Sequence, residues 1–225
     1  MQLFASRAAL AQALAQDTGK ALASHLNTHK TAVLAVSGGT TPMAFFEALS
    51  QLDLDWARIM VTLVDERWVP EDNPRSNAAL VRRHLLTSKA AKAGFLPLYN
   101  GEQTPALGIK ALESALAAQD LPLAAAILGM GEDGHTASFF PAGDHLAAAL
   151  DLESGRLLET MVAPGAGEPR ITLTLPVLLR ADFLALHIEG EKKREVLARA
   201  QAEGTDAEMP VRAVLRHSPD IYWCP

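Results

Sequence analysis

The chain has 225 residues, of which 49% are hydrophobic, 20% are charged and only 5% are aromatic. This length can bury one sizeable core made mainly of aliphatic side chains, and we expect a single α/β domain over residues 1–225. The formal net charge is −6, and no run of like charges stands out, which argues against nucleic acid or an anionic membrane as a partner. An anionic ligand would therefore need a local cluster of basic side chains.

The spacing of apolar residues predicts the elements along the chain. Leucines at positions 10, 14, 22 and 26 predict a first helix over residues 5–29. Apolar runs bounded by turn residues predict buried parallel strands at 32–36, 59–64 and 124–128. Helices are predicted between these strands, after Pro42 and over 76–86 and 105–118. Further strands are predicted at 157–162, 171–175, 183–188 and 221–223, with helices over 191–202 and after Pro210.

This alternation of strands and helices predicts a doubly wound α/β fold, with a mostly parallel sheet flanked by helices and some mixed edge. No internal repeat, low-complexity linker or domain boundary is visible in the sequence. In open α/β sheets, ligands bind beyond the carboxyl ends of the strands. The loops that follow the first three apolar runs are therefore the candidate site.

The first of these loops is Ser37-Gly38-Gly39-Thr40-Thr41-Pro42. Two glycines allow a ligand to approach the backbone, and Pro42 fits the first position of a helix that Thr41 would cap. N–H groups at the start of a helix bind anions, phosphate above all. A tight turn between strand and helix would use the same glycines, but of the two interpretations we favour phosphate binding.

The second loop is Asp65-Glu66-Arg67, followed by Ser76-Asn77. The guanidinium of Arg67 can present a fork of donors to a phosphate or a carboxylate. Charged residues after a buried strand also form ordinary surface ion pairs. Taken in isolation, this segment favours neither role.

The third loop runs from Gly129 to Ser138 and contains Gly129-Met130-Gly131-Glu132-Asp133-Gly134-His135. It matches the G-x-G-x-x-G pattern of dinucleotide-binding proteins, but Pro141 stops the following helix and no acidic residue ends the next strand. The remaining interpretation is a catalytic His135, because histidine is the usual general base near neutral pH. Asp133 would either orient the imidazole or cap the following turn.

The remaining sequence signals exclude several chemistries. No serine-hydrolase elbow, P-loop, zinc-binding H-E-x-x-H motif or cysteine pair is present, so we expect no catalytic metal. The single Cys224 offers no disulfide, and neither a signal peptide nor an apolar stretch of about 20 residues is visible. We therefore expect a cytoplasmic protein, and the sequence does not determine its oligomeric state, although a monomer is compatible with it. The other histidines are expected to be structural: His25, His29, His84, His145, His187 and His217.

Taken together, the three loops resemble those of the 6-phosphogluconolactonase family over nearly the whole chain. The resemblance continues through Pro169-Arg170-Ile171-Thr172-Leu173-Thr174, Gly190-Glu191-Lys192-Lys193, Pro210-Val211 and Tyr222-Trp223. It implies a fold shared with glucosamine-6-phosphate deaminases and related sugar-phosphate isomerases. It also implies hydrolysis of a phosphorylated sugar lactone, 6-phosphogluconolactone, in the pentose phosphate pathway, with no metal or organic cofactor.

The same resemblance implies residue roles. His135 would be the general base, with Asp133 beside it. Substrate or phosphate binding is expected of Ser37, Gly38, Gly39, Thr40, Thr41, Asp65, Arg67, Gly131, Arg170 and Lys193. Which of the three cations holds the phosphate stays open, and Lys192 is a neighbour that can be confused with Lys193. The departures from the family pattern are small, namely Phe139-Phe140 in place of a Leu-Phe pair and Cys224 where an acid often stands.

Two other functions compete with this one. A deaminase acting on an amino-sugar phosphate is disfavoured, because the related family has Asp-Glu-Tyr where this chain has Asp65-Glu66-Arg67, and an acid where it has Phe139-Phe140-Pro141. A non-catalytic phosphosugar sensor is disfavoured because no DNA-binding helix pair, basic tail or second domain is present. A pure binding protein would also have no use for His135.

Overall fold

The computed structural model describes residues 1–225. Its centre is a seven-stranded sheet in which every neighbouring pair of strands is parallel. In spatial order the strands are β1 (Gln2–Leu3), β10 (Asp220–Cys224), β9 (Phe183–Glu189), β6 (Ala125–Leu128), β2 (Ala32–Val36), β3 (Ile59–Leu63) and β5 (Gly94–Leu96). Every residue of β2 and β6 is buried, as expected of strands covered on both faces. The expected α/β fold with a mostly parallel sheet is confirmed.

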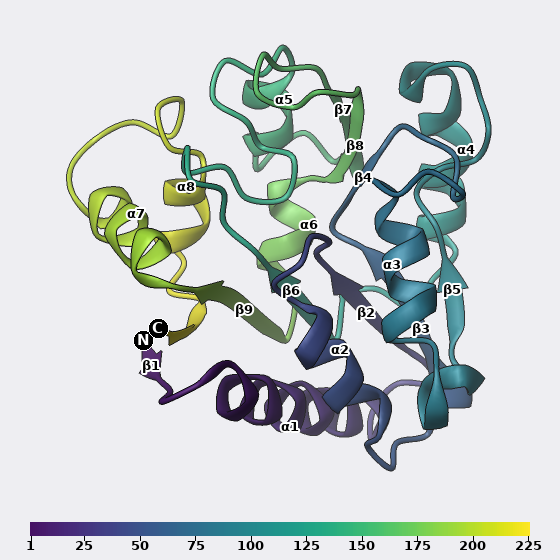
Figure 1. Ribbon diagram of the computed structural model, residues 1–225. Helices are drawn as coiled ribbons and strands as arrows, with labels where there is room; N and C mark the ends of the chain where they lie inside the picture. The colour runs from purple at the N-terminus through teal and green to yellow at the C-terminus, as the bar shows by residue number, and fades with distance from the viewer.

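Helices flank this sheet (Figure 1). The long helix α1 (Arg7–Leu26) contacts β2, β6, β9 and β10, and α2 (Met43–Ser50) packs against α1. Helix α7 (Glu191–Gln201) packs on β9 and on α8 (Val211–Leu215). The other helical segments are η1 (Trp56–Arg58), α3 (Asn77–His84), η2 (Ser88–Lys92), α4 (Pro105–Ala117), α5 (Leu146–Leu150) and α6 (Leu175–Leu179). No helix combines the length and the apolar character needed to traverse a bilayer.

A second, antiparallel sheet lies near the top of Figure 1, beside α5. It consists of β4 (Asp65–Arg67), β8 (Arg170–Leu173) and β7 (Leu158–Met161) in that order. The prediction of a loop at residues 65–67 was wrong. The prediction of a mixed edge on the main sheet was also wrong, because the strands predicted at 157–162 and 171–175 lie in this separate sheet. Pairing between β4 and β8 joins residues about a hundred positions apart, and no local pattern specifies such a partner.

Helix α2 begins one residue later than expected. Pro42 is its N-cap, and the carbonyl oxygen of Pro42 accepts a hydrogen bond from the N–H of Phe46 at 2.8 Å. No side chain caps this helix, so the prediction that Thr41 would do so was wrong. The Thr41 hydroxyl forms no hydrogen bond within the protein and is therefore available to a ligand.

A buried carboxylate connects β4 to α3. The Glu66 side chain accepts hydrogen bonds from its neighbour's N–H, from the N–H groups of Asn77 and Ala78 at 2.8 Å, and from the Ser76 hydroxyl at 3.2 Å. Glu66 is fully buried. It therefore satisfies N–H groups that the first turn of a helix leaves without partners, and it holds α3 against the strand that carries Asp65.

We expect the substitution Glu66→Ala to lower the free energy of unfolding by about 2–5 kcal/mol, because it leaves several buried donors without an acceptor. Chemical denaturation monitored by circular dichroism measures this loss. Glu71→Ala is the matched control, since Glu71 forms only a half-exposed ion pair with Arg82, and it should cost about 1 kcal/mol or less. Equal losses in the two variants would contradict the role given to Glu66.

Candidate functional site

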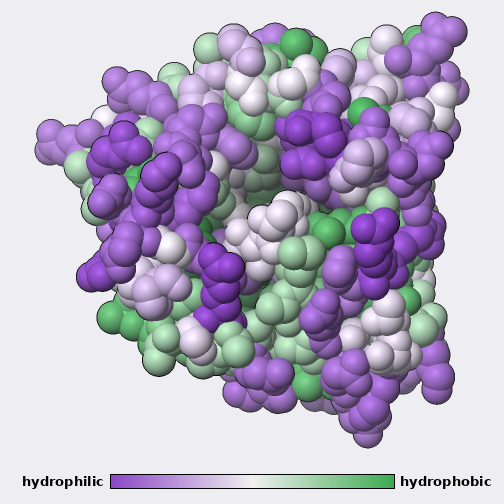
Figure 2. Space-filling model, in the orientation of Figure 1, coloured by the Kyte–Doolittle hydropathy of each residue, from purple (hydrophilic) through white to green (hydrophobic).

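The three loops predicted from the sequence meet at one pocket of about 390 Å³. Its lining comes from the loops after β2 and β6, from β4, β8 and β9, and from the first turn of α7. Figure 2 shows a hollow near the centre of this face, with pale residues of intermediate hydropathy inside it and hydrophilic residues on both sides. The volume is in the range of small-molecule sites.

His135 and Asp133 form a hydrogen-bonded pair at the rim of this pocket. Asp133 Oδ1 lies 2.6 Å from His135 Nδ1 and also accepts the backbone N–H of His135 at 3.1 Å. Asp133 thus orients the imidazole and closes the turn at the same time. Because a carboxylate only accepts, Nδ1 carries the hydrogen, and Nε2 is left as the basic nitrogen of the neutral ring.

The electrostatics of the pair favour an ionised Asp133. Burial raises the pKa of the Asp133 carboxyl, but the hydrogen bonds and charge of His135 outweigh burial and lower the pKa below its usual value. The ring of Phe140 lies against the imidazole, with ring centroids 4.3 Å apart. The histidine side chain is 30% exposed, so water can reach it.

Gly131 makes the position of this pair possible. A Cβ atom at residue 131 would lie 2.1 Å from His135 Nδ1 and 2.5 Å from Asp133 Oδ1. The N–H of Gly131 also donates to the carbonyl oxygen of His135 at 2.8 Å. Only a residue without a side chain therefore leaves room for His135 and Asp133 in this arrangement.

The loop after β2 has the properties of an anion cradle. The backbone N–H groups of residues 38–41 have no acceptor within the protein. Gly38 packs so tightly against Asn77 that an added Cβ would lie 1.7 Å from Asn77 Oδ1, and Gly39 has a φ of +90°. Gly38 thus allows the close contact with Asn77, and Gly39 allows the positive φ. The four backbone N–H groups of residues 38–41 remain free to donate to a ligand.

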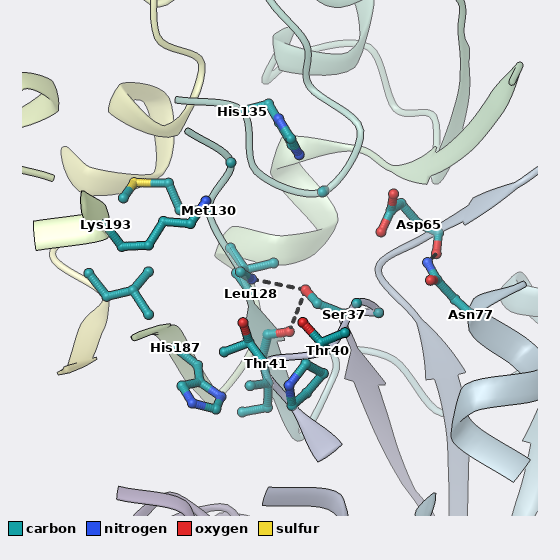
Figure 3. A pocket seen from close by; sticks show the side chains of 18 of the residues that line it. Ser37, Thr40, Thr41, Asp65, Asn77, Leu128, Met130, His135, His187 and Lys193 are labelled. Carbon is teal, nitrogen blue, oxygen red and sulfur yellow. Dashed lines mark hydrogen bonds between the residues drawn. The ribbon is translucent and has the colours of Figure 1, made fainter. Parts of the chain in front are cut away.

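The hydroxyls of this loop differ in their availability. The Ser37 hydroxyl donates to the carbonyl oxygen of Ile127 and accepts the N–H of Gly129, both at 3.0 Å, so it joins two of the predicted loops (Figure 3). The hydroxyls of Thr40 and Thr41 form no hydrogen bond within the protein. The latter two are therefore the free side-chain donors of the cradle.

Two arginines line the pocket from the antiparallel sheet, where Arg67 and Arg170 are directly paired across β4 and β8. The Nε atom of each is buried and has no partner. Arg170 donates to the carbonyl oxygen of Ala166 at 2.6 Å and lies 3.6 Å from Asp65. Asp65 in turn accepts the Ser138 hydroxyl at 2.6 Å, so its carboxylate is engaged with the protein and positions Arg170.

Lys193, on the first turn of α7, lines the pocket on the side of β9, whereas Lys192 does not line it and is 80% exposed. Burial lowers the pKa of the Lys193 ammonium, although the charges of Glu132 and Asp133 partly oppose this effect. The structure therefore separates the two neighbouring lysines. All three cations expected from the sequence, Arg67, Arg170 and Lys193, line the pocket.

The structure adds pocket residues that sequence reasoning had not assigned to the site. Asn77 donates to the backbone oxygen of Asp65 at 2.9 Å, and its place in a Ser-Asn pair after the second loop was the available signal. Phe140 lies against the imidazole of His135, and Glu189, the last residue of β9, also lines the pocket. His187 had been assigned a structural role, yet it lines the pocket. No group of three metal-ligating side chains is present.

Comparison with known proteins gives a consistent result. Residues 5–223 match the family model described as glucosamine-6-phosphate isomerases/6-phosphogluconolactonase. The 6-phosphogluconolactonase of Rhizobium meliloti is 51% identical over 228 residues, covering 100% of this chain and 98% of the relative. The corresponding protein of Pseudomonas aeruginosa is 44% identical, covering 100% of this chain and 94% of the relative.

Solved structures show the same architecture. A 6-phosphogluconolactonase from Shewanella baltica superimposes with a TM-score of 0.96 at 36% identity, covering 100% of this chain and 97% of that one. A monomeric glucosamine-6-phosphate deaminase gives a TM-score of 0.76 at 18% identity, covering 99% and 95%. The latter similarity concerns the fold alone.

Proposed function

Since the chain belongs to the glucosamine-6-phosphate isomerase/6-phosphogluconolactonase family, we propose that it hydrolyses 6-phosphogluconolactone to 6-phosphogluconate, with His135 as the general base that activates water. The reaction is the lactone-hydrolysis step of the oxidative pentose phosphate pathway, and residues 1–225 act as one domain. The observation that carries the mechanism is the oriented His135–Asp133 pair at the rim of a pocket that also contains an anion cradle.

The phosphate binds at the cradle formed by residues 38–41. Four free N–H groups and the hydroxyls of Thr40 and Thr41 supply donors, and Lys193 supplies a positive charge from the first turn of α7. Helix starts and turn amides of this kind suit phosphate. Binding of the phosphate holds the lactone carbonyl beside His135. The binding energy of a group remote from the reaction is thus used to orient the reacting carbon.

Hydrolysis proceeds by attack of water on the lactone carbonyl carbon. His135 Nε2 takes a proton from the water while its oxygen forms the new bond to carbon, and the carbonyl becomes a tetrahedral oxyanion. When this intermediate collapses, the bond between the carbonyl carbon and the ring oxygen breaks. The protonated His135 then donates its proton to the departing ring oxygen, which becomes a hydroxyl of the open acid.

The developing oxyanion needs donors that are already in place. The N–H of Met130, in the same loop as His135, has no acceptor within the protein and is one such donor. The paired arginines of β4 and β8, Arg67 and Arg170, each retain an unpartnered Nε atom at the pocket. The positive charges of the two arginines stabilise the negative charge of the oxyanion. Their N–H groups can also donate to oxygens of the lactone.

The surroundings of His135 argue against deamination of an amino sugar. Phe140 lies against the imidazole, and Arg67 occupies the position where the deaminase pattern has a tyrosine. An isomerising deaminase needs further acid and base groups to move protons along an open-chain sugar. Release of ammonia from glucosamine 6-phosphate would reverse this conclusion.

The direct test mixes the purified protein with freshly prepared 6-phosphogluconolactone and follows acid release at short times in a pH-stat. We expect the rate to exceed spontaneous hydrolysis in proportion to enzyme concentration. Tight binding of the product without any turnover would instead support a phosphosugar sensor.

The two adjacent lysines provide a matched pair for testing the phosphate site. We expect Lys193→Ala to raise KM for the phosphorylated lactone roughly tenfold or more, because a charge-assisted contact contributes about 1.5–3 kcal/mol. Lys192→Ala should leave KM and kcat unchanged, since Lys192 is 80% exposed and lies outside the pocket. Initial-rate kinetics on both variants measure the difference, and equal effects would remove Lys193 from the phosphate site.

Affinity for the product should weaken at alkaline pH. An ordinary lysine loses its proton near pH 10.5. Because burial lowers the pKa of Lys193, its ammonium loses its proton at a lower pH than that. We expect the Kd of 6-phosphogluconate to rise as the pH increases through this lowered pKa. Lys193→Arg keeps its charge throughout this range, so this rise should be absent in titration calorimetry of that variant. A rise of the same size there would refute the assignment.

A further inference from the structure

A second histidine lies in the pocket, and the chemistry at His135 does not use it. His187 projects from β9 and is only 3% exposed. In Figure 3 it lies below Thr41, whereas His135 lies above Thr41, and both histidines line the pocket. Its ring and the ring of Phe45 lie nearly perpendicular to each other, with centroids 6.3 Å apart.

The hydrogen bonds of His187 leave one nitrogen without a partner. Its Nε2 lies 3.1 Å from Glu189 Oε1, and the other oxygen of Glu189 pairs with Arg7 at 3.0 Å. A carboxylate only accepts, so Nε2 carries the hydrogen. Nδ1 is buried and has no partner in the protein, which is uncommon for a buried polar atom and marks a place for a ligand contact.

We propose that His187 binds the phosphate group of the substrate through Nδ1 and takes up a proton as it does so. This inference rests on the proposed function, because it assigns the phosphate to the cradle above His187. The oxygens of a phosphate dianion accept hydrogen bonds, so a lone pair on Nδ1 would repel them. A protonated ring instead donates a charge-assisted hydrogen bond, and Glu189 stabilises the added charge from the other side.

The charges around His187 agree with proton uptake. On its own strand it faces Glu189, and from α2 the uncharged ring of Phe45 lies beside it. The ionisable groups of other elements that a contact, the strand register or the pocket links to this site include Arg7 and Asp17 of α1, Tyr222 of β10 and Lys193 of α7. Arg7 pairs with Glu189, and Asp17 accepts the Tyr222 hydroxyl at 2.8 Å. The incoming phosphate is therefore the charge that a proton on His187 would balance.

The test compares wild type, His187→Gln and His187→Asn by titration calorimetry with 6-phosphogluconate at pH 8. Two buffers of different ionisation enthalpy give the number of protons taken up. At this pH the phosphomonoester is already a dianion, since its second pKa is about 6, so uptake reports the protein. The glutamine amide can replace the Nε2 contact to Glu189, whereas the asparagine amide can replace a donor at the Nδ1 position.

We expect His187→Gln to raise the Kd roughly tenfold to a hundredfold and to take up fewer protons than wild type. His187→Asn should keep more of the affinity but lose the proton uptake. Glu189→Gln, which leaves His187 in place, should also reduce the uptake. Thermal unfolding identifies any variant that fails to fold.

Lys192→Ala is the matched control, because Lys192 is 80% exposed and lies outside the pocket, and its Kd and proton uptake should equal those of wild type. Unchanged Kd and unchanged proton uptake in both His187 variants would overturn the inference. If wild type meanwhile hydrolyses 6-phosphogluconolactone, the proposed function stands without it. Absence of turnover in wild type would instead count against the proposed function, while the binding measurements still decide the role of His187.

Discussion

Replacing His135 by asparagine is expected to lower kcat about 10²–10⁴-fold, the usual range for loss of a general base. Asparagine retains polarity and approximate size but cannot accept a proton from water. Because the anion cradle and Lys193 lie on other elements, the Kd of 6-phosphogluconate should change little. Stopped-flow detection of acid release measures kcat against the spontaneous reaction.

A second variant, Asp133→Asn, tests the other member of the pair. The amide can still lie beside Nδ1, but it loses the charge that favours an imidazolium, so it too should lower kcat with little change in product binding. If His135→Asn hydrolyses the lactone at the wild-type rate, another group activates the water and the mechanism fails. A large loss of product affinity with unchanged kcat would place His135 in the binding site instead.

Gly131→Ala is expected to lower kcat at least 10²-fold, although residue 131 contributes no functional group. The added Cβ would lie 2.1 Å from His135 Nδ1, a separation that no stable contact allows, so the imidazole must move. A displacement of about 1 Å in an active site can cost a hundredfold in rate. The steric conflict is with the histidine–aspartate pair, so phosphate binding should persist.

The double variant Gly131→Ala/His135→Asn distinguishes displacement of the base from a separate effect. If the alanine acts only by moving His135, it should cost little once that side chain is already inactive. Initial rates of the four proteins complete the cycle. Full additivity of the two losses, or a wild-type rate in Gly131→Ala, would contradict this explanation.

Several elements were predictable because their signals are local. The helix predicted over residues 5–29 is found at Arg7–Leu26, and Ser6 caps it by accepting the N–H of Ala9. The runs at 32–36, 59–64 and 124–128 are buried strands within one or two residues of their predicted ends. In contrast, β1 and β5 were not predicted, because two or three residues show no periodicity, and their existence depends on a neighbouring strand.

The prediction failed where partners are distant in sequence. The antiparallel sheet arises from pairing of β4 with β8, and that pairing brings Arg67 and Arg170 together. His187 looked like an ordinary strand histidine, since alternation along β9 says nothing about which face reaches a ligand. It is a pocket residue only because the loop after β2 and the end of β9 meet at the same pocket.

The amino-acid sequence by itself determined the α/β class, the loops at the strand ends and the candidate base, because apolar periodicity, glycine-rich turns and a histidine among glycines are each visible within a few residues. The tertiary structure alone decided which nitrogen of His135 is free, that Gly131 is needed for steric reasons, and that His187 lines the same pocket as the loop after β2. These properties depend on distances between atoms of segments that fold together from far apart in the chain, or on the exact course of a turn. Neither is encoded in a residue type.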